Sequence, residues 1–181
     1  MIDTASKTGT DNDATAVTFF AKGHVGIYPL MILDWDIVQI EGATLETWLP
    51  TVFEKLEQLS RCCRARCGSV GVWIEDKNSG TILLQQALRR RWAAHAIESQ
   101  LTAMGKDERA ISVSGYVYRG EVKYADHAFN QTVSYKGKAR NHLVEQVENF
   151  RVGDKDNMRE DDLLDTFCYG IAIALGNEKG F

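Results

Sequence analysis

Acidic residues at the borders of apolar segments are the part of this chain most suited to chemistry. They occur in three places: Asp3, Glu75 with Asp76, and the run Asp161–Asp165. Divalent magnesium takes oxygen ligands, and a pair of such ions can clamp the attacking and leaving oxygens of a phosphate. Carboxylates that converge from three distant segments would hold such ions. The pattern therefore predicts metal-dependent phosphodiester chemistry.

The second acidic segment follows a short run of β-branched residues. Val70, Val72 and Ile74 alternate with Gly71 and Trp73, which predicts a strand that ends just before Glu75. Ligands of open α/β sheets lie at such carboxyl edges. The alternative is that Glu75 and Asp76 only open a turn and cap the next helix, as acids in such places often do.

The third acidic segment precedes an apolar stripe with helical spacing, made of Leu163, Leu164, Phe167, Cys168, Ile171, Ala172 and Leu175. Asp161 and Asp165 are four residues apart, and Asp162 and Asp165 are three apart, so both pairs are neighbours on a helix. Compensation of the helix dipole is the alternative explanation, but one aspartate would satisfy it. The cluster therefore favours a cation.

The elements that must position these acids form an α/β pattern. We expect strands at 16–20 and 25–40 with a turn at 22–24, a helix from Thr44 to about Gly68, and a strand at 70–74. A helix over about 79–101 should carry Leu84, Leu88 and Trp92 inward, and Pro50 is tolerable only near the first turn of its helix. With the strand at Asp3, this gives three early antiparallel strands and then a parallel crossover.

The pattern weakens beyond Gly105. Residues 108–117 fit either a helix or a strand, 120–124 fit a short strand, and 126–138 read as a polar loop. A helix over 143–150 and a charged linker over 153–160 lead into the last acidic helix.

Four segments together resemble a known family: Ile2–Ala16, Ile74–Gln85, Gly105–Ala110 and Asp161–Asp165. They are similar to the first acidic strand, the second acidic motif with its glycine turn, a basic motif and the third acidic motif of the tailed-bacteriophage terminase large subunit nuclease domain. The resemblance covers almost the whole chain. It implies a ribonuclease H-like fold, with a mixed central sheet flanked by helices, and a DNA endonuclease that cuts concatemeric DNA during genome packaging.

The resemblance also implies roles for individual residues. Asp3, Glu75 and one or both of Asp161 and Asp162 would bind two Mg²⁺ or Mn²⁺ ions as catalytic ligands. Asp13 would be an accessory acid, although Asp11 could take its place. Asp165 is either a further ligand or a brace for the helix or for another ligand.

Basic residues are the candidates for contact with double-stranded DNA. Lys106 and Arg109 would face a phosphate or order the acids, unless they belong to a solvated turn. Clusters at Arg61, Arg64 and Arg66 and at Arg89, Arg90 and Arg91 could neutralise phosphates, or could be solvated helix faces. The formal net charge is −4, but the remainder is mildly basic once the candidate site acids are set aside.

Length and composition indicate one domain over residues 1–181, with 44% hydrophobic residues to form its core, and the resemblance implies that it is a nuclease domain. No phosphate-loop motif G-x-x-x-x-G-K-[S/T] is present, so we expect no ATPase domain. An ATPase motor, a small terminase subunit and a portal would be the partners in a packaging machine. The absence of an apolar run of membrane-spanning length predicts a protein of the bacterial cytoplasm with no membrane partner.

Two further interpretations remain open. Only two residues precede Asp3, so the first strand is short, and the chain could be a catalytically inactive prophage module that docks on a motor, a portal or DNA. A resolvase or a ribonuclease H would present similar acids.

Cys62, Cys63 and Cys67 lack the second ligand pair of a zinc site and should be free thiols, and Cys168 should be a core residue.

Overall fold

The computed structural model describes residues 1–4, 14–23, 28–40, 44–77, 79–154 and 160–176. Their centre is a six-stranded sheet with the order β5-β4-β1-β2-β3-β6. The strands are β1 (Ile2–Asp3), β2 (Thr15–Lys22), β3 (Leu30–Val38), β4 (Val72–Ile74), β5 (Ala94–Ala96) and β6 (Val122–Tyr124). All run in one direction except β2, which is antiparallel to both β1 and β3. The expected mixed α/β sheet is confirmed.

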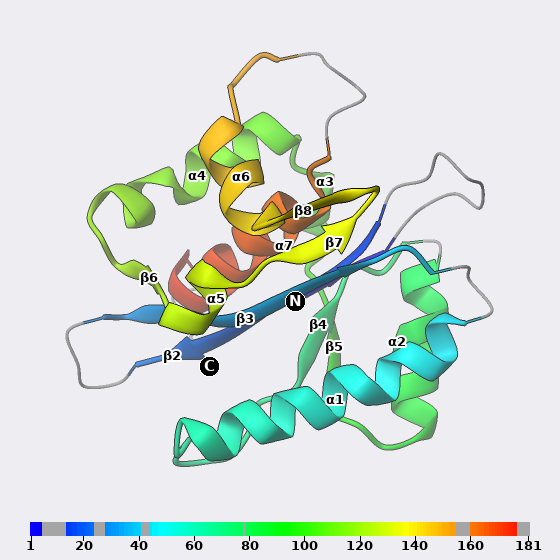
Figure 1. The fold of residues 1–181 in the computed structure, drawn as a ribbon. Helices are drawn as coiled ribbons and strands as arrows, with labels where there is room; N and C mark the ends of the chain where they lie inside the picture. The colour runs from blue at the N-terminus through cyan, green and yellow to red at the C-terminus, as the bar shows by residue number, and fades with distance from the viewer. Residues whose placement is uncertain (5–13, 24–27, 41–43, 78, 155–159, 177–181) are drawn as a thin grey trace.

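Helices cover both faces of the sheet (Figure 1). One face carries α1 (Leu45–Cys62) and α2 (Ser79–Arg89). The other face carries α4 (Lys106–Tyr118), α6 (His142–Asn149) and α7 (Asp162–Ile171), which continues into the π-helical turn η1 (Ala172–Gly176). Each layer buries its own apolar cluster, with Leu49 and Ile74 in the first and Leu143 and Leu163 in the second.

Three short elements complete the chain. They are α3 (Ser99–Ala103), α5 (Asp126–Asn130) and the two-stranded hairpin of β7 (Val133–Tyr135) and β8 (Lys138–Arg140). Residues 126–138 are therefore not a polar loop. Ala128 is buried and accepts a hydrogen bond from Trp35 Nε1 at 2.9 Å, and Lys136 and Gly137 turn the hairpin with φ of 47° and 73°.

The helix expected over 79–101 is also wrong in its length. Helix α2 ends at Arg89, and Arg91 has a φ of 57°, which reverses the chain into β5. The buried face of α2 is formed by Leu83 and Ala87, whereas Leu88 is 58% exposed. Leu84 and Trp92 are partly buried against the same core, as expected, so Leu88 is the one residue of the predicted inward face that is misplaced.

Pro50 lies in the second turn of α1 rather than the first. A proline there cannot donate to the carbonyl oxygen of Glu46, four residues earlier. That oxygen instead accepts a hydrogen bond from Gln86 Nε2 of α2 at 3.0 Å. A side chain of the neighbouring helix therefore replaces the hydrogen bond that proline removes.

Helix α1 ends at Cys62 rather than near Gly68, so it is shorter than expected. Other expectations hold more closely. Residues 108–117 are helical within α4, and β6 and α6 lie where the pattern placed them. The strand before Glu75 is shorter than expected, since Val70 is exposed and pairing begins at Val72. None of the helices in the described part of the chain combines the length and apolar character needed to cross a bilayer.

Candidate functional site

Asp3 and Glu75 lie side by side at the carboxyl edge of two neighbouring parallel strands. Ile2 of β1 is paired with Ile74 of β4, and the backbone N–H of Glu75 donates to the carbonyl oxygen of Ile2 at 3.1 Å. Successive strand residues point to opposite faces. Since Ile2 and Ile74 are buried on the α1 and α2 side, Asp3 and Glu75 point to the α7 side, where their carboxyl groups form a hydrogen bond.

The environment places the proton of this pair on Asp3. Burial, the hydrogen bond with Glu75 and the negative charges of Asp165 and Asp162 raise the pKa of Asp3 well above its ordinary value. Burial also raises the pKa of Glu75, but hydrogen bonds with Asp3 and Lys77 outweigh it, so that the pKa of Glu75 is lowered. Asp3 therefore donates and Glu75 accepts.

Glu75 is held from several directions. Its Oε1 contacts Lys77 Nζ at 2.8 Å and accepts a hydrogen bond from the Tyr169 hydroxyl at 3.3 Å. The turn after Glu75 brings buried Gly80 directly against the carbonyl oxygen of Glu75, where a Cβ atom would overlap with it. Thus the glycine expected after the second acidic motif is required by the close approach of α2 to β4.

The third acidic segment forms the start of α7. Asp161 occupies the N-cap position and its carboxylate pairs with Lys106 Nζ. In the first turn, Asp162 Oδ2 accepts a hydrogen bond from the backbone N–H of Ala14 at 3.2 Å. That contact joins α7 to the residue before β2, a strand that is separated from β4 by β1.

Asp165 lies one turn deeper and pairs mainly with Arg109. The Arg109 guanidinium is 2.5 Å from Asp165 Oδ1, and Lys106 Nζ is 3.7 Å from Oδ2. Burial raises the pKa of Asp165, although both cations oppose the shift. Asp165 thus matches the role of a brace that the sequence left open.

Arg109 is buried, with only 5% of its surface exposed. It donates to the carbonyl oxygens of Leu101 and Met104 at 3.3 and 3.1 Å and stacks over the Tyr169 ring at 4.4 Å. Of the two roles considered for Arg109, ordering the acids is therefore favoured over contact with a DNA phosphate. Lys106, which is only partly buried, takes part in the same cluster.

The donor set suits a hard divalent cation. Asp3, Glu75, Asp161 and Asp162 supply only carboxylate oxygens, the ligands that Mg²⁺ and Mn²⁺ prefer. Glu75, Asp162 and Asp165 act electrostatically on Asp3, and a proton keeps the carboxyl group of Asp3 neutral. Within the described residues, however, no three His, Cys, Asp or Glu side chains stand ready as a metal-binding group. Asp3 and Glu75 form the pair that would hold a cation first.

The structure separates the other predicted residues from this pair. Asp13 and Asp11 lie outside the described residues. Asp76 is exposed, and its Oδ1 accepts a hydrogen bond from the Thr81 hydroxyl at 2.7 Å, which supports the helix-starting role for Asp76.

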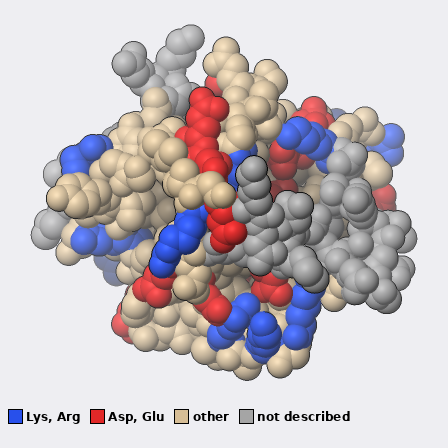
Figure 2. Space-filling view, turned by 90° about the horizontal axis from the view of Figure 1, so that it is seen from above, with Lys and Arg blue, Asp and Glu red and all other residues tan. Residues whose placement is uncertain are grey.

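Arg89, Arg90 and Arg91 lie at the opposite edge of the sheet. Helix α2 starts beside Glu75 and ends at Arg89, about 16 Å away along its axis. The three arginines are exposed, and Arg90 stacks on Trp92 at 5.1 Å. They therefore do not belong to the acid cluster. The face seen in Figure 2 likewise carries acidic and basic side chains close together, without a continuous basic patch.

The cysteines behave as the sequence predicts. Cys62, Cys63 and Cys67 are exposed free thiols, and Cys168 is a buried free thiol on α7. Burial raises the pKa of Cys168 to about 12, so it is an unreactive core residue.

Sequence reasoning missed Tyr169 and Lys77 as partners of Glu75. Tyr169 is four residues after Asp165, hence on the same side of α7, and it is 1% exposed. A buried tyrosine hydroxyl needs a polar partner, which was an available signal. Lys77 gave no signal, because only the turn after β4 brings it back to Glu75.

Comparisons of the chain with protein-family models, curated proteins and solved structures found no match.

Proposed function

We propose that this domain is a metal-dependent DNA endonuclease of the ribonuclease H-like class, similar to the nuclease domain of phage terminase large subunits. The observation that carries the proposal is the hydrogen-bonded pair of Asp3 and Glu75 at adjacent strand ends, with Asp162 and Asp165 within electrostatic reach. Acids from two distant segments of the chain thus affect the pKa of Asp3, which supports the proposal.

The sheet topology supports the finer fold assignment. The sequence pattern predicted three early antiparallel strands followed by a parallel crossover, and the order β3-β2-β1-β4-β5, with β2 alone reversed, fits that arrangement. It makes β1 central and places the end of β1 beside the end of β4. An acid at each end therefore faces the same side of the sheet.

The residues have distinct tasks in the proposed reaction. Asp3 and Glu75 would hold the divalent metal, with Asp162 and Asp161 at the start of α7 as further ligands. When bound, Mg²⁺ or Mn²⁺ supplies activation of water and stabilisation of the leaving 3′ oxygen. Asp3 must release its proton to bind a cation, while Lys77 and Tyr169 keep Glu75 oriented. Arg109 and Lys106 hold Asp165 and Asp161 in place.

The inactive-module interpretation receives less support. It expects Asp3 to be displaced from Glu75, whereas the two carboxyl groups are hydrogen bonded. A resolvase or ribonuclease H would use the same acids, so the substrate must separate these activities. The ATPase motor, small subunit and portal remain proposed partners by resemblance.

Plasmid cleavage tests the proposal. The purified domain is incubated with supercoiled plasmid in Mn²⁺, Mg²⁺ or EDTA, beside Asp3→Asn and Glu75→Gln. We expect metal-dependent nicking or linearisation, lost by at least about a hundredfold in both variants because each removes a metal ligand. Asp76→Asn is the matched control, since Asp76 is the exposed neighbour of Glu75, and it should cleave like the parent.

Calorimetric titration with Mn²⁺ gives a readout independent of cleavage. Binding that weakens in Asp3→Asn and Glu75→Gln but not in Asp76→Asn supports the site. A folded domain that neither binds Mn²⁺ nor cleaves would overturn the proposal. Equal cleavage by all variants would also contradict it. A ribonuclease H is indicated if only RNA–DNA hybrid is cut, and a resolvase if only four-way junctions are cut.

A further inference from the structure

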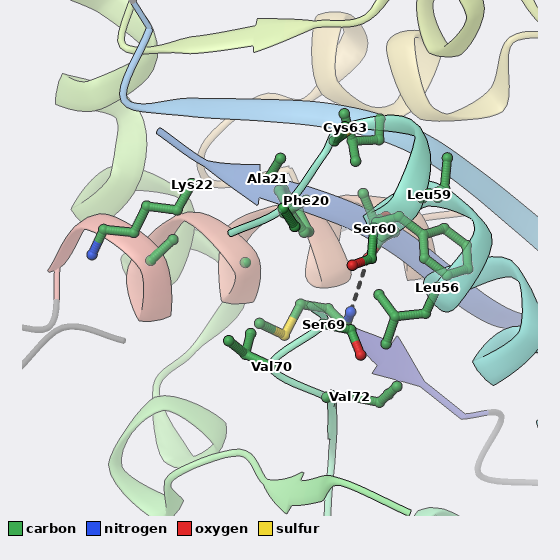
Figure 3. Close-up of a pocket in the computed structure, with 18 of the residues that line it drawn as sticks. Phe20, Ala21, Lys22, Leu56, Leu59, Ser60, Cys63, Ser69, Val70 and Val72 are labelled. Carbon is green, nitrogen blue, oxygen red and sulfur yellow. Dashed lines mark hydrogen bonds between the residues drawn. The ribbon is translucent and has the colours of Figure 1, made fainter. Parts of the chain in front are cut away.

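The apolar cavity at the amino edge of the sheet, between β2 and β4, has a volume of about 490 Å³. Figure 3 shows Phe20 of β2 and Leu56 and Leu59 of α1 among the residues that line it. In the described part of the chain no Asp or Glu lines this cavity, so it is unsuited to a metal cation. The acid cluster at the carboxyl edge, by contrast, consists of two halves that are neutralised in different ways.

In the half formed by Asp3 and Glu75, a proton neutralises Asp3. Lys77 contacts Glu75 at 2.8 Å and is also held by the carbonyl oxygen of Thr102 at 2.9 Å. A cation that binds between Asp3 and Glu75 therefore displaces a proton, which passes to water. This half is thus suited to exchange its proton for a metal cation.

The half formed by Asp161 and Asp165 is neutralised by Lys106. The Lys106 ammonium pairs with the Asp161 carboxylate and lies 3.7 Å from Asp165 Oδ2. The two acids are four residues apart at the start of α7, where like charges repel each other. Lys106 therefore lies between two carboxylates, as a bridging metal ion would.

The ammonium of Lys106 stays charged in this position. Burial opposes its charge, but the negative charges of Asp165, Asp161 and Asp162 outweigh burial, so that the pKa of Lys106 is raised. Asp162 also acts electrostatically on Asp3, so it lies between the two halves. The two halves are thus parts of one acid cluster.

Lys106 is tethered where it lies. It begins helix α4, and Arg109 in the same turn is buried and lies 2.5 Å from Asp165 Oδ1. The pair of Arg109 with Asp165 holds α4 against α7, which keeps the ammonium at a high local concentration beside Asp161. A tethered group of this kind competes well with a ligand that must come from solution.

We propose that Lys106 fills the second of two cation positions in the acid cluster, so that the domain without DNA binds one divalent ion, at Asp3 and Glu75. This inference rests on the proposed function, because it takes Asp3 and Glu75 as the first metal position. It goes beyond that function by assigning to Lys106 the control of how many ions are bound. Lys106 must leave Asp161 before a second ion can be bound there.

Calorimetric titration of the full chain with Mn²⁺ tests the proposal. We expect one bound ion for the parent. Lys106→Met removes the ammonium and keeps a side chain of similar length, so it should bind a second ion at least about tenfold more tightly than the parent does. Lys106→Arg keeps the positive charge and should behave like the parent. Lys123→Met is the matched control, because Lys123 is exposed on β6 and its substitution removes the same charge.

Two double variants locate the second ion. Lys106→Met with Asp161→Asn should bind one ion again, because the second position loses a ligand. Lys106→Met with Glu75→Gln should lose the first ion and keep the second. Circular dichroism checks that all variants fold.

The outcomes separate this inference from the proposed function. The inference is overturned, and the nuclease proposal stands, if the parent binds two ions or if Lys106→Met gains none. The same holds if Lys123→Met gains as much as Lys106→Met, or if the gain persists with Asp161→Asn. If Glu75→Gln alone leaves Mn²⁺ binding unchanged, the proposed metal site is wrong and the inference falls with it.

Discussion

The carboxyl edge and the amino edge of the central sheet differ in where they place charged and apolar groups. At the carboxyl edge, Asp3, Glu75 and Asp165 are largely withdrawn from solvent: a proton neutralises Asp3, Lys77 pairs with Glu75, and buried Arg109 pairs with Asp165. At the amino edge, by contrast, the pair of Arg119 with Glu121 is exposed, and the sheet borders an apolar cavity. The two edges therefore differ: one carries a cluster of largely buried charges, and the other borders an apolar cavity.

This contrast separates interactions that matter for stability from those that do not. A buried ion pair costs much when one partner is removed, because a charge is left without compensation. An exposed pair is screened by water and contributes little. The carboxyl edge should therefore be sensitive to single substitutions, and the amino edge should tolerate them.

The largest difference between the edges should come from Arg109→Ala. It leaves Asp165 buried without its main cation and should lower the free energy of unfolding by about 3–5 kcal/mol in urea titrations. Arg119→Ala removes an exposed pair at the amino edge and should change little. The double variant Arg109→Met with Asp165→Leu should recover most of the loss. Similar effects of Arg109→Ala and Arg119→Ala would break the comparison.

Gly80→Ala should show the next largest effect. The added Cβ would overlap with the carbonyl oxygen of Glu75, and overpacking of this kind costs about 1–3 kcal/mol. Gly115→Ala, in α4, meets only the flexible end of Arg119 and should stabilise the helix by about 0.5–1 kcal/mol. Chemical denaturation measures both. A loss in Gly115→Ala as large as that in Gly80→Ala would contradict the account.

The third prediction concerns pH in the presence of EDTA. The raised pKa of Asp3 means that the folded state keeps a proton that the unfolded chain loses above about pH 4, so folding stability should fall as pH rises through the raised pKa. Each unit of pKa difference corresponds to about 1.4 kcal/mol. Asp3→Asn removes this titration, so its stability should gain on the parent as pH rises from about 4, the ordinary pKa of aspartate, through the raised pKa of Asp3. Asp76→Asn should run parallel to the parent, and parallel curves for Asp3→Asn would refute the assignment of the proton.

The smallest expected effect is that of Tyr169→Phe. It removes one hydrogen bond to Glu75 and should cost about 1 kcal/mol of stability. It should also weaken Mn²⁺ binding, because Glu75 loses an orienting contact. Tyr118→Phe is the amino-edge control, since Tyr118 is 93% exposed, and no change is expected from it. Unaltered stability and Mn²⁺ binding in Tyr169→Phe would remove Tyr169 from the site.

Strong periodicity made part of this architecture predictable. The stripe from Leu163 to Leu175 predicted α7 with acids in its first turn. The alternation before Glu75 predicted β4 with Glu75 at the carboxyl end of the strand. The short strand β5 and the β7 and β8 hairpin were missed, because three residues are too few to show a period. The contacts of Lys77 and Tyr169 with Glu75 were missed for another reason: they depend on how separate elements pack, which local spacing does not encode.

The contacts that join α7 to the sheet have a consequence for the order in which the protein is made. Thr18 and Thr166 share a hydrogen bond across 148 positions of sequence, and Ala14 and Asp162 are separated equally far. Contacts of such separation form late, after the loop between them has closed. On a translating ribosome, β1 and β4 emerge well before α7. Until α7 has been made, Asp3 and Glu75 therefore lack the contacts that α7 provides. The proposed cutting activity would thus be withheld from the cell's DNA until synthesis has passed α7 and the fold is complete.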